Sequence, residues 1–341
     1  MSGVEINMFR WHWKVALCLG FMAALAVFFS GTLASASEPK PERPFYNRFS
    51  SEEETQLGAA LARKIENDGI PFAGSQGQPQ TMRVKRDTAL ETYLESVASK
   101  LGQCSQRPEI RYSVRVLDAP DVINAFSIPG GHIYVTSGLL DFVQTEAELA
   151  AVLGHEIGHI VARHSINRIA RVGLFTLLLA QARESGLIPD AATAQKLADI
   201  AMPILFEADA RTFYSRDDEI EADLLGQYEM VRAGWDPEGE ATLLARLAKK
   251  SPENGPLAAL IATHPDPADR LLIVRNESKV AAFPGGLKQD SSEFKAMKRA
   301  MHPPADAQLS PRLIPLAVAL FVICAAILFT KSFVNKKTTT C

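Results

Sequence analysis

The sequence predicts an α+β fold that is predominantly helical, with a small antiparallel sheet and an apolar segment at each end. Three observations support this prediction. Apolar residues in the central region recur at helical spacing, and acidic residues stand at several of the predicted helix starts. A short alternating run and a Pro-Gly-Gly turn indicate the few strands. The apolar segments at the two ends are long enough to cross a bilayer.

The composition limits the classes of function. The chain has 341 residues, of which 47% are hydrophobic and 22% are charged, which is ordinary for one large globular domain or two small ones. Its net charge of -3 offers no basic surface, so we expect no nucleic-acid partner. Four cysteines without a C-x-x-C pair argue against a cysteine-based zinc site.

The N-terminal residues 1–36 read as a secretory leader. Arg10 and Lys14 precede the uncharged run 15–33, and Ala34-Ser35-Ala36 comes after it as an A-x-A pattern. This order predicts a cleaved signal peptide. The run is also long enough to stay in the membrane as a signal anchor, and both alternatives remain open. Residues 37–50, rich in proline and charge, are predicted to be a linker.

The C-terminal region predicts a transmembrane helix over residues 313–330, which carry no charge. Arg312 precedes this run, and a basic tail over residues 331–341 comes after it. Residues 281–312 mix proline, glycine and charge and are expected to form a juxtamembrane linker. Because a leader directs export of the chain behind it, we expect the domain at 51–280 to be tethered to the bilayer outside the cytoplasm. The periplasmic side of a bacterial inner membrane fits best.

Within this domain the first half alternates helices with strands. Ser50 or Ser51 caps a helix that runs to about Asn67, and residues 71–80 are expected to form a loop. A helix is predicted over 87–101 and a strand over the alternating residues 110–117. Residues 124–136 predict a hairpin around Pro129-Gly130-Gly131. The hairpin is either an ordinary turn or an edge strand to which an extended peptide could add.

The second half is predicted to be helical. One helix spans 145–169, and the apolar run 172–182, with 11 residues, is too short to cross a bilayer and predicts a buried or interfacial helix. Another helix spans 219–233 and ends at Gly234. A turn rich in proline over 263–267 leads into a helix over 268–276.

The stretch His155-Glu156-x-x-His159 carries the chemistry of the domain. Residues four apart share one helix face, so both histidines can reach the same metal ion. Glu156 is turned about 100° from His155 and can take a proton from a water beside the metal, as a general base. Gly158 is costly inside a helix, which suggests close approach by another segment. The alternative is a buried amphipathic helix whose histidines hydrogen-bond locally.

A catalytic zinc ion needs a third protein ligand and one open position. Glu219 is the best candidate, and Asp223 lies one helical turn later, where it could accept the second ring N–H of a ligand histidine. Glu221 is expected to face away from both. Asp217 and Asp218 are expected to be partners of the helix dipole rather than ligands.

The remaining histidines have weaker cases for a role at the metal. His264, in the turn held by prolines, could stabilise the oxyanion or take the open position on the metal. His132 has no clear place in the site. His164 lies five residues after His159 and is not expected to share its helix face.

These motifs together resemble the HtpX-like and CAAX-prenyl-protease-like gluzincin metallopeptidases, peptidase family M48. The resemblance covers roughly Glu52 to Asn276 and is closest to the BepA-like periplasmic branch, which shares the 124–136 stretch and Thr263-His264-Pro265. It implies a zincin-like domain with one Zn²⁺ held by His155, His159 and Glu219, and Glu156 as the catalytic acid. The chain lacks an extension long enough for a repeat module.

The sequence therefore predicts a zinc metalloendopeptidase that is tethered to the membrane and hydrolyses protein or peptide substrates, with extracytoplasmic protein quality control as its expected role. Two alternatives remain open. The chain could be a catalytically silent chaperone or scaffold stabilised by zinc, although Glu156 has no evident structural duty there. It could also be a CAAX-type processing enzyme, which the missing membrane helices around the site disfavour. The sequence does not specify the oligomeric state.

Overall fold

The computed structural model describes residues 38–42, 44, 47–73, 79–171, 198–199, 201–202, 205, 214–249 and 255–302. The chain divides into two compact units after Gln289. The second unit contains helix α13 (Ser292–Met301), which is capped by Ser291, and the other described helices and strands belong to the first. Helix α13 lies within the segment 281–312, which is expected to be a juxtamembrane linker.

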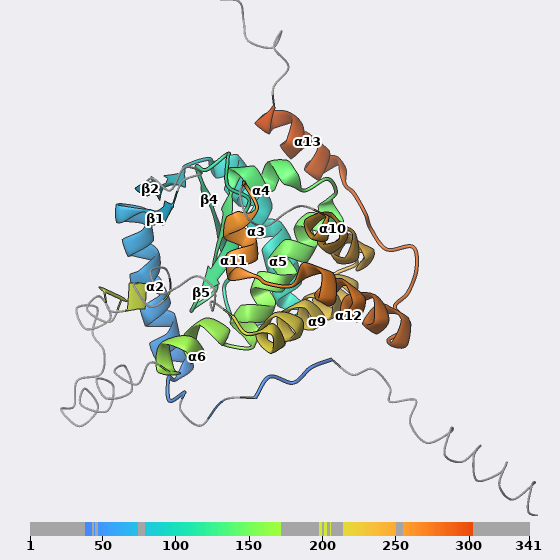
Figure 1. Ribbon diagram of the computed structural model, residues 1–341, viewed down its shortest axis with the longest axis horizontal. Coiled ribbons are helices and arrows are strands. Elements are labelled where there is room, and N and C mark those ends of the chain that lie inside the picture. Colours follow the sequence, from blue (N-terminus) through green and yellow to red (C-terminus); the bar gives the residue numbers. More distant parts are fainter. Residues whose placement is uncertain are drawn as a thin grey trace, which may run out of the picture. The chain divides into compact units, whose positions relative to one another are not determined.

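A four-stranded sheet with the order β3-β4-β6-β5 lies beside the central helix of the first unit (Figure 1). The strands are β3 (Val84–Lys85), β4 (Ser113–Leu117), β5 (Ala125–Ile128) and β6 (His132–Thr136). The predicted hairpin is present, with Gly130 and Gly131 at φ values of 84° and 94° in its turn. The strand predicted at 110–117 begins only at Ser113, because Ile110 is held in a turn by Arg107.

The four-stranded sheet is mixed, whereas the sequence predicts a small antiparallel sheet. β6 runs antiparallel to β5 but parallel to β4, with Val114 opposite Ile133. The connection between β4 and β5 leaves the place next to β4 empty. β5 then becomes the outer strand and β6 returns between β5 and β4. A second, two-stranded sheet joins β1 (Ile70–Ala73) to β2 (Pro79–Met82), so the predicted loop at 71–80 begins and ends in strands.

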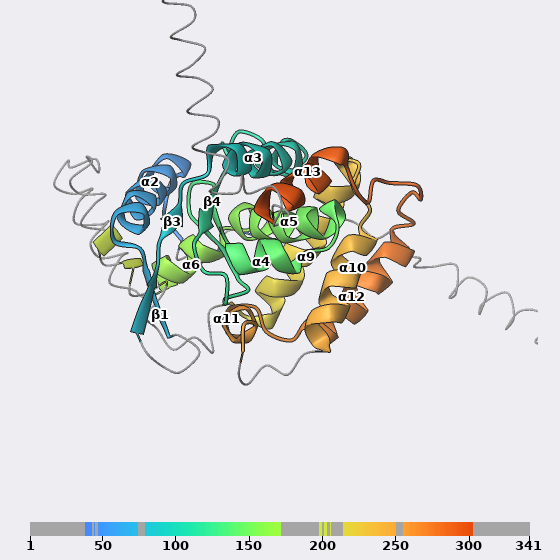
Figure 2. The same cartoon turned by 90° about the horizontal axis from the view of Figure 1, so that it is seen from above.

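Helices cover the sheet on both faces (Figure 2). Helix α2 (Ser51–Asp68) begins at a capping box made by Ser50 and Glu53, and its residues Leu57 and Leu61 join a core with Tyr134 of β6. Because strand side chains alternate, the neighbouring buried residues Ile133 and Val135 face the other way. On that side lie α3 (Thr88–Gln103), capped by Asp87, and α5 (Glu146–Val161).

The predicted helix over 145–169 is two helices. α5 ends at Val161, and α6 (His164–Arg171) begins after a turn in which Arg163 has a φ of 61°. A left-handed residue cannot continue a right-handed helix, so the chain changes direction there. The predicted helix at 172–182 lies outside the described residues.

Further helices complete the wall around α5. The predicted helix at 219–233 is α9 (Arg216–Arg232), and α12 (Pro267–Val280) comes after the predicted proline turn. The other described helices of this unit are α4 (Ser137–Phe142), α10 (Glu238–Ala248) and α11 (Ala258–Thr263). Within the described part of the chain, no helix has both the length and the apolar composition needed to cross a bilayer. The predicted membrane segments at 15–33 and 313–330 lie outside the described residues.

Candidate metal centre

Helix α5 supplies two histidines and a glutamate to one buried place. Thr145 caps the helix by accepting a hydrogen bond from the backbone N–H of Glu148, and every residue of the helix is buried. His159 is completely inaccessible, and Glu156 is 1% exposed. A buried polar residue must find partners inside the protein, so the partners of these side chains show what the site is built to hold.

Helix α9 brings the third candidate ligand, and two pairs of small residues let it come close. A Cβ atom on Gly158 would lie 2.5 Å from the carbonyl oxygen of Ala222, and one on Gly226 would lie 2.9 Å from the carbonyl carbon of Gly154. The close approach predicted from Gly158 is therefore present, and α9 makes it. Ser215 and Asp218 form a capping box that starts α9 just before Glu219, so Asp218 caps the helix rather than binding metal.

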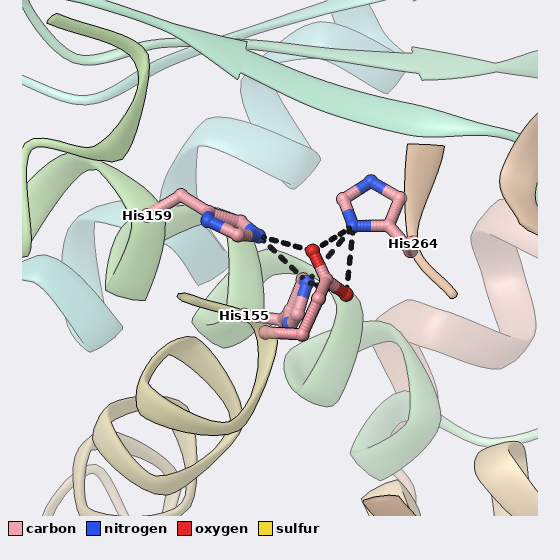
Figure 3. A group of neighbouring side chains, drawn as sticks. His155, His159 and His264 are labelled. Carbon is pink, nitrogen blue, oxygen red and sulfur yellow. Dashed lines mark hydrogen bonds and ion pairs between the residues drawn. The ribbon is translucent and has the colours of Figure 1, made fainter. Parts of the chain in front are cut away.

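Four donor atoms converge between these helices and the turn after α11 (Figure 3). Nε2 of His155 lies 3.0 Å from Nε2 of His159, and Nε2 of His159 lies 3.3 Å from Oε1 of Glu219. Nδ1 of His264 lies 3.2 Å from Nε2 of His155 and 3.0 Å from Oε1 of Glu219. The structure thus brings the three predicted ligands together with His264, the residue for which the sequence leaves open a place on the metal or an oxyanion role.

The donor set fits a zinc ion. Four ligand atoms placed tetrahedrally about 2 Å from zinc are about 3.3 Å from one another, which matches these separations. Imidazole nitrogens and a carboxylate oxygen are ligands that zinc accepts. Burial, together with the neighbouring His155, holds the pKa of His159 well below its ordinary value, so its ring is neutral, as a ligand must be. Facing lone pairs in a dry site repel one another unless a cation lies between them.

Asp223 orients the first histidine as predicted. Its Oδ1 atom accepts a hydrogen bond of 2.7 Å from Nδ1 of His155, which leaves Nε2 of that ring free to bind metal. Asp223 has a partner that no sequence motif predicts, which is Arg270 of α12. Arg270 donates from Nε to Asp223 at 2.7 Å and from Nη1 to Oε2 of Glu219 at 2.6 Å.

Arg270 sets the charge of both carboxylates. Burial alone would raise the pKa of Glu219, but the charges of His264 and Arg270 outweigh it and hold the pKa well below its usual value. Burial also opposes ionisation of Asp223, and the charge of Arg270 with hydrogen bonds from Arg270 and His155 again lowers the pKa. Both acids are therefore ionised. Arg270 occupies one oxygen of Glu219 and leaves Oε1 facing the histidines.

A second histidine stands behind His159, although its spacing in the sequence predicts no such contact. Nδ1 of His164 lies 2.8 Å from Nδ1 of His159, and Nε2 of His164 lies 3.0 Å from Oε2 of Glu221. The break at Arg163 makes this contact, because it turns His164 back toward the preceding helix. Glu221, predicted to face away from Glu219 and Asp223, is not part of the donor set and contacts the site through His164.

Glu156 lies beside the donor set without belonging to it. Its Oε1 atom is 3.6 Å from Nε2 of His264, and its buried Oε2 atom has no hydrogen-bond partner among the described residues. A buried carboxylate oxygen without a donor is costly unless water or a ligand completes it. This is the position that a general base beside a metal needs.

Residues 85–278, more than half of the chain, match the sequence model of a protein family described as Peptidase family M48. The chain belongs to peptidase family M48. Its relatives include the mitochondrial metalloendopeptidase OMA1 of Schizosaccharomyces pombe, 32% identical over 52% of this chain and 50% of that protein. They also include OMA1 of Arabidopsis thaliana, 28% identical over 62% of this chain and 42% of that protein. The beta-barrel assembly-enhancing protease of Yersinia pestis is 29% identical over 67% of this chain and 47% of that protein.

The family confirms the resemblance seen in the sequence and the choice of zinc as the metal. The chain spans about half the length of these curated relatives. The M48 domain of this chain contains the candidate metal centre, because His155, His159, Glu219 and His264 all lie between residues 85 and 278.

Proposed function

We propose that this M48 chain is a zinc endopeptidase that hydrolyses protein or peptide substrates, with Glu156 as general base. One observation carries the proposal: the buried, unpartnered Oε2 of Glu156 lies beside four converging donor atoms of His155, His159, Glu219 and His264. A scaffold stabilised by zinc needs the donors but has no use for a second buried carboxylate whose Oε2 atom lacks a hydrogen-bond donor in the described chain. Two relatives are named as metalloendopeptidases, which agrees with the proposal.

In this proposal some residues bind or orient the zinc ligands, and Glu156 transfers the proton. His155, His159 and Glu219 hold the zinc, and Asp223, Arg270 and His164 fix the orientation of these ligands. When bound, zinc polarises the scissile carbonyl and makes a neighbouring water more acidic. Glu156 takes a proton from that water and returns it to the leaving amine.

His264 occupies the place that substrate or water must use. With Nε2 donating to the carbonyl oxygen of Ala125 at 3.3 Å, its Nδ1 atom points at the donor set. A catalytic zinc keeps one position open, so we take this arrangement to be a closed one. His264 would leave the position when substrate enters, and the oxyanion role is the alternative for its displaced ring.

Membrane tethering and an extracytoplasmic position belong to the same proposal. They rest on the leader at 1–36 and the apolar run at 313–330. The proposed order is leader or anchor, linker at 37–50, peptidase domain at 51–280, juxtamembrane segment at 281–312, membrane helix and basic tail. One relative is named for enhancing beta-barrel assembly, which supports a role in extracytoplasmic quality control.

Cleavage of a denatured protein separates the peptidase from the alternative of a silent chaperone or scaffold. The full chain loaded with zinc should cut casein, lose this activity with a chelator and regain it with added zinc. A chain that binds zinc but cuts neither casein nor a mixture of unfolded proteins would refute the peptidase. If that chain also slows aggregation of unfolded proteins, the scaffold is the better explanation.

A further inference from the structure

A cavity adjoins the candidate metal centre on the side of α10 and α12. His155, Glu156 and His264 form part of its wall, so the cavity is continuous with the place where a scissile bond would lie. It is built by α5, α10, α11 and the start of α12 together with single residues from the sheet, α4 and α9. A side chain next to the scissile bond could therefore enter it.

The wall of this cavity is aliphatic. Three leucines come from α10, namely Leu243, Leu244 and Leu247, and α11 adds Leu260 and Ile261. Ala151 and Val152 of α5, with Ala125, Leu139 and Pro267, complete its apolar lining. Among the described residues, no phenylalanine, tyrosine or tryptophan contributes to this wall. Apolar walls favour an apolar occupant because both lose contact with water.

Apart from Glu156, the proposed general base, the charged residues in the lining are mostly paired with one another. Asp223 and Arg270 form a hydrogen-bonded ion pair, and Arg270 also binds Glu219. Neither offers a free charge to a substrate. Glu240 differs, because it is 4% exposed and neither of its carboxylate oxygens accepts a hydrogen bond from a donor in the described chain.

The surroundings of Glu240 disfavour both kinds of charged occupant. Burial and the nearby charge of Asp223 raise the pKa of Glu240 well above its ordinary value, so it is neutral at neutral pH. An acidic side chain in the cavity would lose its hydration without gaining a free cation as partner. A basic side chain would meet the charge of Arg270, which already has its own partners.

We propose that this cavity receives one neutral aliphatic side chain of the substrate, from a residue that flanks the scissile bond, and that α10 and α11 set the preference. The inference rests on the proposed peptidase function and adds a substrate class to it: peptide bonds next to leucine-like residues. Acidic and basic residues at that position should be rejected.

The test is a cleavage profile of the full zinc-loaded chain on a mixture of peptides with all residue types, read by mass spectrometry. We expect Leu, Ile, Val or Met to be enriched about tenfold or more over Asp, Glu and Lys at one of the two flanking positions. A flat profile would overturn the inference. Enrichment of Lys or Arg would overturn it as well, because Glu240 would then act as an ionised partner.

Two matched variants test whether the wall of the cavity sets the preference for the side chain next to the scissile bond. Leu260→Phe fills the cavity from α11, where the side chain is half-buried and its replacement spares the core. It should shift the preference toward Ala and Gly. Leu272→Phe makes the same change at a side chain that is 69% exposed and outside the lining, and it should leave the profile as it was. An unchanged profile in Leu260→Phe would contradict the assignment.

A binding measurement separates this inference from the peptidase proposal. Glu156→Gln loaded with zinc is titrated with the hydroxamates of leucine, glutamate and lysine, and calorimetry gives the affinities. Leucine hydroxamate should bind about tenfold or more tightly than the others, even if no protein substrate is ever cut. Equal affinities would overturn the cavity assignment whatever the cleavage assay shows.

Discussion

The Nδ1 atoms of His159 and His164 lie 2.8 Å apart, so His164, which is outside the donor set, holds the ring of the proposed ligand His159. If Nε2 of His159 binds zinc, its Nδ1 carries the proton and donates it to His164. His164 then carries its own proton on Nε2 and donates to Glu221, 3.0 Å away. This chain of hydrogen bonds fixes the tautomer of the buried ligand from the outside.

Replacing His164 by leucine should therefore weaken zinc binding. Loss of the acceptor leaves the Nδ1–H of His159 unpaired, and we expect zinc affinity to fall about 10- to 100-fold. His164→Asn keeps an acceptor and should recover part of this loss. Competition with a chelator of known affinity measures the zinc affinity of each variant, with His132→Leu as the matched control. Equal zinc affinity in His164→Leu and wild type would show that the contact has no such role.

Removing Arg270 should destabilise the metal-free chain more than the zinc-bound one. Arg270→Met leaves the buried carboxylates of Glu219 and Asp223 without their cation. Breaking such a pair costs about 3–5 kcal/mol in the free energy of unfolding. Urea unfolding with and without zinc checks this, since zinc restores a positive charge beside Glu219. A variant that is as stable as wild type without metal would refute the electrostatic role.

His264→Ala should bind zinc more weakly yet cut short peptides faster than wild type. The variant lacks the fourth donor but keeps three ligands and opens the position that substrate needs. Initial rates at saturating zinc test this prediction. If the rate instead falls at unchanged zinc occupancy, the oxyanion role is correct and the closed arrangement is not.

Glu229 should make folding less favourable as the pH rises. Burial raises the pKa of this carboxyl well above its ordinary value, and neither oxygen has a partner in the described chain. The folded state keeps the proton that the unfolded state releases, so stability is lost above the unfolded pKa, up to about 1.4 kcal/mol per pH unit. Glu229→Gln should therefore differ least from wild type near pH 4 and exceed its stability near pH 8. Parallel stability curves in urea would contradict the prediction.

Local signals explain the features that the sequence could predict. Ser50 and Asp87 cap the helices that begin after them, and the spacing of His155 and His159 already requires one helix face. The close approach at Gly158 could be predicted because glycine is costly in a helix. Glu219 could be found because its own helix start and the turn spacing to Asp223 are visible in the chain.

The remaining features depend on tertiary contacts. Nothing in the sequence indicates that Arg163 takes a left-handed conformation, and without that break His164 cannot meet His159. Arg270 carries no motif that points to Glu219, because the pairing depends on how α12 meets α9. The parallel pairing of β4 and β6 likewise depends on which strand of the hairpin lies next to β4, and strand patterns do not encode this.

The most direct test compares the two buried glutamates of the centre, one assigned as ligand and one as base. Zinc content and casein cleavage are measured for wild type, Glu219→Gln and Glu156→Gln, each as the full chain. We predict one zinc per chain with cleavage in wild type, loss of both in Glu219→Gln, and full zinc without cleavage in Glu156→Gln. A full equivalent of zinc in Glu219→Gln, or cleavage by Glu156→Gln, would contradict the assignment of ligand and base.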